Sequence, residues 1–187
     1  MARPAVWIAA FGVSAFGVNA ANAQSLTLTS PDIKEGGTIA TEQIITGFGC
    51  IGGNISPALS WSGAPAGTKS FAINMLDPDA PTGSGWWHWV VFNIPPGTTS
   101  LPKDAGNLKK KLMPKGAIQS RTDFGTGGYG GPCPPPGKPH RYQITVFAVG
   151  VDKLPSAKND KASAAAVGFD LHFHAIAKAT LTGLYGR

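Results

Sequence analysis

Residues 77–96 read DPDAPTGSGWWHWVVFNIPP, and they combine a stiff acidic turn with an apolar segment. Asp77 and Ala80 each precede a proline, which disfavours helical backbone and favours extended geometry at both positions. The turn is therefore predicted to be a kinked, non-helical rim that holds the carboxylates of Asp77 and Asp79 in place.

The second half of this stretch is predicted to be a buried strand. Residues 86–92 (WWHWVVF) are aromatic and β-branched, which is typical of buried strands. Because side chains alternate along a strand, His88 is expected on the same face as Trp86, Val90 and Phe92. A buried imidazole without a polar partner is unfavourable by a few kcal/mol. One of the two carboxylates of the preceding turn is the expected partner.

A second stretch, residues 129–142 (YGGPCPPPGKPHRY), has a similar organisation. Its three consecutive prolines predict an extended rim, and the residues that follow Arg141 predict a long strand. Alternation places His140 and Tyr142 on one face and Arg141 on the other, where an ion pair is expected. The two stretches are predicted to form two walls of one pocket.

The predicted pocket contains carboxylates, imidazoles, phenols and the backbone amides of glycine-rich turns. Protonated imidazoles, phenol O–H groups and backbone N–H groups all donate hydrogen bonds to a small anion such as phosphate. The carboxylates would repel an anion, so they are expected to accept from an imidazole N–H and to orient its ring. Anion binding is then expected to weaken above the ordinary histidine pKa of ~6.5. The predicted ligand-binding residues are Asp77, Asp79, His88, Tyr129, Gly131, Pro132, His140 and Tyr142.

Composition indicates one domain rich in turns. The 187 residues include 25 glycines and 16 prolines, and 42% are apolar, which favours short strands around a real core over a helical bundle. The net charge is +6, but only 14% of the residues are charged. The balance reflects scarce acids more than a dense basic surface, so no nucleic-acid partner is predicted.

The first 23 residues are predicted to be a secretory signal peptide, followed by one domain over residues 24–187. Arg3 provides positive charge, residues 5–18 are uncharged and largely apolar, and residues 21–23 (ANA) fit a small-x-small cleavage site. The alternative is an uncleaved anchor helix, but the apolar run is shorter than the ~20 residues that a span needs. The mature chain is therefore expected in the periplasm or outside the cell, without a transmembrane segment.

Several ordered motifs resemble the phosphatidylethanolamine-binding protein family, in its bacterial Raf-kinase-inhibitor-like branch. They are DPDAP at residue 77, WWHWVVFNIP at residue 86 and YGGPCPPPGKPHRY at residue 129, with CIGGNISPALSW at residue 50 and the ending LYGR. The likeness spans nearly everything after residue 24. It implies a mainly β fold of two antiparallel sheets with a few short helices. It also implies a small anion cavity for phosphate-containing headgroups at the matching positions Asp77, His88, His140 and Tyr142.

The two cysteines, Cys50 and Cys133, are a possible disulfide. An even pair favours a disulfide in an oxidising compartment, although sequence alone leaves open whether the two are close enough to bond. No cofactor and no metal site are predicted. His172 and His174 offer only two ligands, and the cysteines lack the spacing of a zinc site.

Two further segments are assigned from their patterns. Residues 101–128 predict a long loop, and its lysine run 109–111 is interpreted as solvated surface, with an acidic partner or headgroup as the alternative. The tail is predicted to start with a helix near the Ala-rich residues 162–166. It is then expected to continue as a strand from His174 and to bring Tyr185 near the pocket mouth.

The function predicted from these features is non-enzymatic binding of a small anionic or phosphate-bearing ligand, with a protein target as a further partner. The first alternative is an inhibitor of a protease or kinase that acts through its surface. The second is a small acid–base hydrolase, since Asp, His and Tyr in one cleft also suit proton transfer. No GxSxG nucleophile elbow is present, which argues against that second alternative.

Overall fold

The computed structural model describes Met1 and residues 25–187. The predicted signal peptide, apart from Met1, lies outside the described residues. The boundary predicted between residues 23 and 24 therefore stays a prediction.

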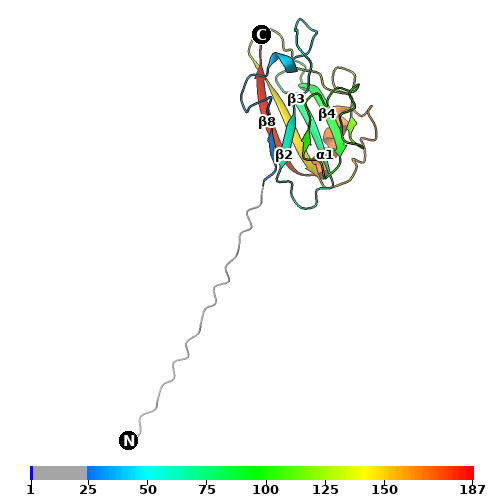
Figure 1. The fold of residues 1–187 in the computed structure, drawn as a ribbon. Helices are drawn as coiled ribbons and strands as arrows, with labels where there is room; N and C mark the ends of the chain where they lie inside the picture. The colour runs from blue at the N-terminus through cyan, green and yellow to red at the C-terminus, as the bar shows by residue number, and fades with distance from the viewer. Residues whose placement is uncertain (2–24) are drawn as a thin grey trace.

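The described chain is mainly β, as predicted, and its strands form two antiparallel sheets (Figure 1). The smaller sheet has the order β1-β2-β5 and the larger one the order β6-β4-β3-β7-β8. One α-helix, α1, and one short 3-10 turn, η1, complete the described elements. In chain order these are β1 (Thr27–Thr29), η1 (Thr41–Gln43), β2 (Leu59–Ser62), β3 (Ser70–Asp77), β4 (Trp86–Ile94), β5 (Ser100–Leu101), β6 (Ile118–Gln119), β7 (His140–Val149), α1 (Ala164–His174) and β8 (Ala175–Tyr185).

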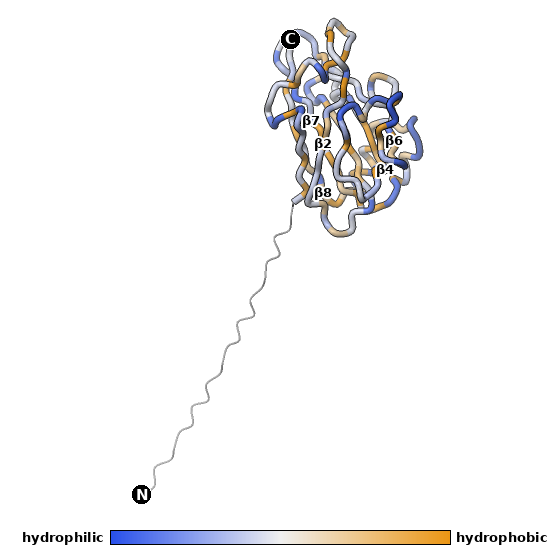
Figure 2. Tube along the Cα trace, viewed as in Figure 1, coloured by the Kyte–Doolittle hydropathy of each residue, from blue (hydrophilic) through white to orange (hydrophobic). Residues whose placement is uncertain are grey.

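The larger hydrophobic core lies between the two sheets. Trp61 of β2 and Phe71 of β3 are both buried in it, and their ring centroids are 5.5 Å apart. Hydrophobic residues follow the central strands, whereas the loops around β6 are largely hydrophilic (Figure 2). This packing holds β3, β4 and β7 side by side, and the proposed site lies at the end of these strands.

The helix α1 packs on the other face of the larger sheet. Ser163 caps it by accepting a hydrogen bond from the backbone N–H of Ala166, and Val167 and Leu171 pack against Val90 and Phe92 of β4. The predicted helix is confirmed, and β8 follows directly, as the alternation after His174 indicates. Because β8 pairs antiparallel with β7 up to the pair His140–Tyr185, the residues after Tyr185 reach the edge where β7 begins.

An irregularity in β4 changes which side chains share a face. Trp87 pairs with Leu76 and Trp89 pairs with Met75, so His88 between them has no partner in β3. This is the pattern of a β-bulge, which shifts the alternation by one residue. The prediction that His88 shares a face with Val90 and Phe92 is therefore wrong. Those two side chains face α1, and His88 lies with Trp86 on the other side.

Candidate functional site

A cavity of about 360 Å³ opens where β3 ends and where β4 and β7 begin. Both sequence stretches that were predicted as walls contribute residues to its lining. The loop of residues 47–50 and the residues after β8 supply the remaining boundary. The lining residues are Phe48, Asp77, Ala80, Pro81, Thr82, Trp86, His88, Phe124, Cys133, Pro134, Pro135, Pro136, His140, Tyr142 and Arg187.

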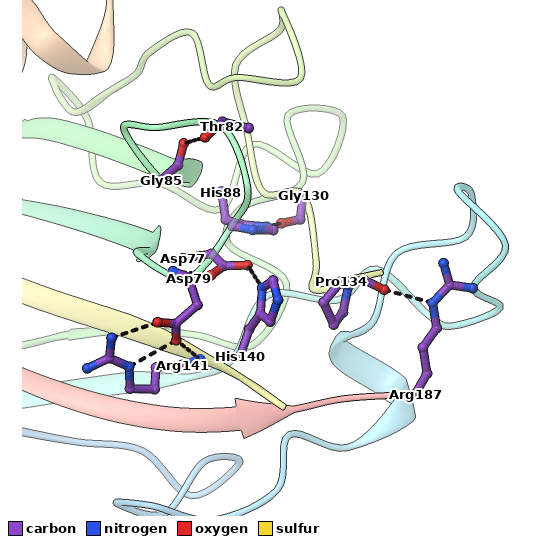
Figure 3. Close-up of polar contacts among 10 residues, drawn as sticks. All are labelled: Asp77, Asp79, Thr82, Gly85, His88, Gly130, Pro134, His140, Arg141 and Arg187. Atoms are coloured by element: carbon purple, nitrogen blue, oxygen red, sulfur yellow. Dashed lines mark hydrogen bonds and ion pairs between the residues drawn. The ribbon is translucent and has the colours of Figure 1, made fainter. Parts of the chain in front are cut away.

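Asp77 orients the imidazole of His140. The Nδ1 atom of His140 lies 2.8 Å from Oδ2 of Asp77, and the pair forms a salt bridge when the ring is protonated (Figure 3). Asp77 is buried, and its Oδ1 accepts from the backbone N–H of Asp79 at 2.9 Å. The carboxylate of Asp77 therefore accepts from an imidazole and from the backbone of its own turn. This is the orienting role that the sequence predicts for a carboxylate of this turn.

His88 has a different partner from the one expected. Its Nδ1–H donates to the backbone carbonyl of Gly130 at 2.6 Å, and no carboxylate bonds to it (Figure 3). The ring is 3% exposed, and its edge packs against Phe124 and Tyr142. Burial lowers the pKa of His88, while the Gly130 carbonyl and the charge of Asp77 oppose that shift. The buried ring therefore favours its neutral form.

Tyr142 presents a hydroxyl without a hydrogen-bond partner. Its side chain is fully buried and lines the cavity, and its Oη bonds to none of the described residues. Burial and the nearby charge of Asp77 raise the pKa of this phenol, so it remains a donor at all physiological pH values. An unpaired buried hydroxyl is unfavourable by roughly 1–3 kcal/mol, and a ligand oxygen would satisfy it.

Asp79 lies outside the cavity lining, in an ion pair with Arg141. The carboxylate accepts from Nε of Arg141 at 2.9 Å, from Nη2 at 2.6 Å and from its backbone N–H at 2.9 Å (Figure 3). These hydrogen bonds hold the pKa of Asp79 at about 2, below its ordinary 3.8. The prediction that Arg141 points away from the pocket into an ion pair is confirmed. The pair fixes the turn that carries Asp77.

The substitution Asp79→Asn is expected to lower the free energy of unfolding by roughly 0.5–1 kcal/mol at pH 7, because solvent screens a pair at the surface. Since the folded-state pKa lies below the unfolded one, the stabilisation is present above pH 3.8 and is lost as the pH falls towards about 2. Urea unfolding of both proteins should therefore show a difference that shrinks between pH 4 and pH 2. Asp152→Asn, at an exposed aspartate, is the control and should change little. A difference that is independent of pH would contradict the ion-pair explanation.

Three other residues predicted as ligands do not line the cavity. Tyr129 is buried behind it, and its hydroxyl donates to the carbonyl of Gln43 at 3.0 Å. The backbone N–H of Gly131 donates to the side chain of Asn54 at 2.8 Å, and Pro132 accepts from the N–H of Ile45. These contacts join the Asn54 turn to the second stretch, which agrees with the interpretation of that turn as structural.

Arg187 is a cavity residue to which the sequence analysis assigned no role. Its guanidinium donates to the carbonyls of Pro134 at 2.7 Å, Phe48 at 3.0 Å and Gly49 at 3.2 Å. Within the part of the chain that the structure describes, no side-chain carboxylate pairs with it. Arg187 therefore places a fixed positive charge at the cavity. The ending LYGR contains this arginine, but residues 184–187 are far along the sequence from both predicted walls, so the sequence did not indicate that Arg187 reaches the cavity.

Three aromatic rings, those of Phe48, Trp86 and Phe124, line one part of the cavity. Phe124 packs edge-on against Trp86 with ring centroids 5.4 Å apart, and Phe48 lies 6.1 Å from Phe124. Phe48 is 70% exposed and has a φ of 52°, an uncommon backbone conformation for a bulky residue. These three rings exclude water from one side of the cavity, which strengthens hydrogen bonds to a bound anion.

The disulfide between Cys50 and Cys133 is present, with the two Cα atoms 6.0 Å apart. It joins the loop that carries Phe48 to the proline-rich rim. The possible disulfide identified from the sequence is thereby confirmed.

The lysine run of residues 109–111 does not line the cavity. Lys110 pairs with Asp104 at 2.7 Å, and Lys109 and Lys111 are exposed. Between residues 25 and 187, no three histidine, cysteine or acidic side chains are grouped as metal ligands would be. The helix described there is too short to cross a bilayer.

The chain belongs to the phosphatidylethanolamine-binding protein family, whose model matches residues 29–186. It is 51% identical over 174 residues to the UPF0098 protein YbcL of Escherichia coli strain K12, across 92% of this chain and 94% of that protein. The crystal structure of E. coli YbcL, described as a new member of the mammalian PEBP family, matches with a TM-score of 0.84 over 87% of this chain and 99% of that chain. These findings confirm the resemblance and the fold.

Two more distant relatives extend the comparison. The structure of a putative PEBP homologue, CT736 from Chlamydia trachomatis, is 30% identical, with a TM-score of 0.73 over 88% of this chain and 99% of that one. A Mycobacterium tuberculosis protein named putative lipoprotein LppC is 36% identical over 126 residues, which cover 67% of this chain and 56% of that protein.

Proposed function

We propose that this protein is a non-enzymatic binding protein whose cavity takes a small anion, either a phosphate-bearing headgroup or another phosphorylated ligand. The observation that carries the proposal is the donor set of the cavity. The side chains of Tyr142 and Arg187 line the same cavity, and among the described residues the Tyr142 hydroxyl has no partner and no side-chain carboxylate pairs with the Arg187 guanidinium. Both groups donate to oxyanions.

The carboxylate of Asp77 would repel an anion that touched it directly, but its surroundings are compatible with this proposal. Its two oxygens already accept from His140 and from the backbone of Asp79, so its charge is shared with an imidazole. The Nε2 atom, on the other side of the His140 ring, has no hydrogen-bond partner among the described residues, and the side chain lines the cavity. A protonated His140 would add a third donor to the cavity.

We further propose that the protein acts outside the cytoplasm. A structural disulfide is typical of oxidising compartments. The name of the mycobacterial relative, a putative lipoprotein, supports the same location. The predicted signal peptide over residues 1–23 is consistent with it.

Isothermal titration of the purified protein with inorganic phosphate and with phosphoethanolamine tests the binding function. Saturable binding with a dissociation constant of roughly 1 mM or tighter is expected, because several charge-assisted hydrogen bonds converge on the anion. The NMR signals of the His88 and His140 rings should shift during the same titration. If neither ligand produces heat or shifts these rings at 10-fold higher concentration, about 10 mM, the proposal is wrong.

A further inference from the structure

The two imidazoles that line the cavity are oriented by different groups. His140 donates its Nδ1–H to the carboxylate of Asp77. His88 donates its Nδ1–H to the carbonyl of Gly130, which has no charge and only accepts. His88 is therefore held with a defined tautomer whose Nε2 atom carries a lone pair when the ring is neutral.

The Nε2 atom of His88 has no hydrogen-bond partner among the described residues, and, like the Tyr142 hydroxyl, it belongs to a side chain that lines the cavity. The ring lines the cavity, and burial lowers its pKa, so the neutral form dominates near pH 7. A ligand that enters the cavity thus meets one acceptor in addition to the donors described above. The titratable and charged groups around this ring are Asp77, Asp123, His140, Tyr142 and Arg187.

We propose that the cavity prefers ligands that bring a proton to Nε2 of His88, namely phosphomonoesters in their monoanionic form, over phosphodiesters. This inference rests on the proposed anion-binding function and specifies its ligand class. A phosphomonoester has a second pKa of about 6, so its monoanion still carries a P–O–H group near neutral pH. That group donates to Nε2, while the other oxygens accept from Tyr142 and Arg187.

A phosphodiester lacks this proton. Every phosphoryl oxygen of a diester is an acceptor, so it would face the lone pair of Nε2 unless His88 became protonated against its burial. The cavity would therefore distinguish a free headgroup phosphate or a phosphorylated side chain from the diester phosphate of an intact phospholipid.

The test compares methyl phosphate with dimethyl phosphate by isothermal titration at pH 6.5. Methyl phosphate is expected to bind at least about 10-fold more tightly, which corresponds to one hydrogen bond to a charged group. Repeating the titration at pH 7.5 in two buffers of different ionisation enthalpy counts the protons taken up. More protons should be taken up with methyl phosphate than with dimethyl phosphate, since only the monoester must gain a proton at this pH to donate to Nε2 of His88.

The variant His88→Leu removes the acceptor and keeps a side chain of similar volume at this buried position. The ratio of the two affinities should then fall towards one, and the difference in proton uptake should disappear. His172→Leu, on an exposed position of α1, is the matched control and should retain the ratio of the unmodified protein.

The outcomes separate this inference from the function on which it rests. If the unmodified protein binds both esters with equal affinity and equal proton uptake, the proposed preference is wrong. The proposed anion-binding function is then retained. If neither ester nor inorganic phosphate binds, the proposed function fails and this inference fails with it. Because the first comparison needs no variant, misfolding of His88→Leu would not prevent the decision.

Discussion

Removal of the Cys50–Cys133 disulfide is expected to lower the free energy of unfolding by about 4 kcal/mol. The bond joins residues 83 positions apart in the sequence, and the loss of chain entropy from cross-linking an unfolded loop of this length corresponds to roughly 4–4.5 kcal/mol. For a domain of this size the midpoint of thermal unfolding should fall by about 10 °C. Denaturant unfolding of the double variant Cys50→Ala, Cys133→Ala measures the change directly.

The reducing agent itself provides the control. The unmodified protein in dithiothreitol should approach the stability of the double variant, and the double variant should not respond to dithiothreitol. A loss below about 1 kcal/mol would mean that the unfolded chain gains little freedom when the bond is broken, contrary to the entropic explanation.

The same change is expected to weaken phosphate binding. Cys133 lines the cavity, and its partner belongs to the loop whose carbonyls at Phe48 and Gly49 accept from Arg187. When that loop is no longer tied to the proline-rich rim, the guanidinium loses its fixed position. Phosphate titration of the double variant at a temperature where it remains folded separates this effect from the loss of stability.

The fold and half of the candidate site could be predicted from sequence because the relevant patterns are local. The strand β7 is regular from His140 to Val149, so simple alternation placed His140 and Tyr142 on the cavity side and Arg141 on the other. The proline-flanked turn likewise predicted the held carboxylate of Asp77. In both cases the geometry depends on neighbours within a few residues.

The errors arise where a distant segment decides the geometry. The bulge at His88 depends on the register between β4 and β3, which no local pattern in β4 reveals. The partner of His88 is the backbone carbonyl of Gly130. Because every residue has a backbone carbonyl, the sequence does not indicate which one accepts a hydrogen bond. Arg187 reaches the cavity only because the β7–β8 hairpin returns the chain to the edge where β7 begins.

Tyr129 and Tyr142 also differ in a way that the sequence does not predict. Both are buried tyrosines near the second stretch, and composition treats them alike. The structure separates them, because the hydroxyl of Tyr129 donates to the carbonyl of Gln43, whereas that of Tyr142 has no partner between residues 25 and 187. That difference makes the pair a matched test of the proposed anion cavity.

The substitution Tyr142→Phe is expected to weaken phosphate binding by about 10-fold or more while leaving the protein at least as stable. A hydrogen bond to a charged ligand contributes roughly 1.5–3 kcal/mol, which corresponds to 10-fold or more in the dissociation constant. In the ligand-free protein the hydroxyl is buried without a partner, so its removal relieves an unsatisfied group and should not lower the free energy of unfolding.

Tyr129→Phe is expected to show the opposite pattern. It removes a hydroxyl that lies outside the cavity and donates to the carbonyl of Gln43, so the free energy of unfolding should fall by roughly 1–2 kcal/mol. Phosphate affinity should be unchanged. Titration and urea unfolding of both variants therefore give a crossed result, with affinity lost in one and stability lost in the other. If Tyr142→Phe binds phosphate as tightly as the unmodified protein, the anion does not reach this hydroxyl, and the donor set proposed for the cavity is wrong.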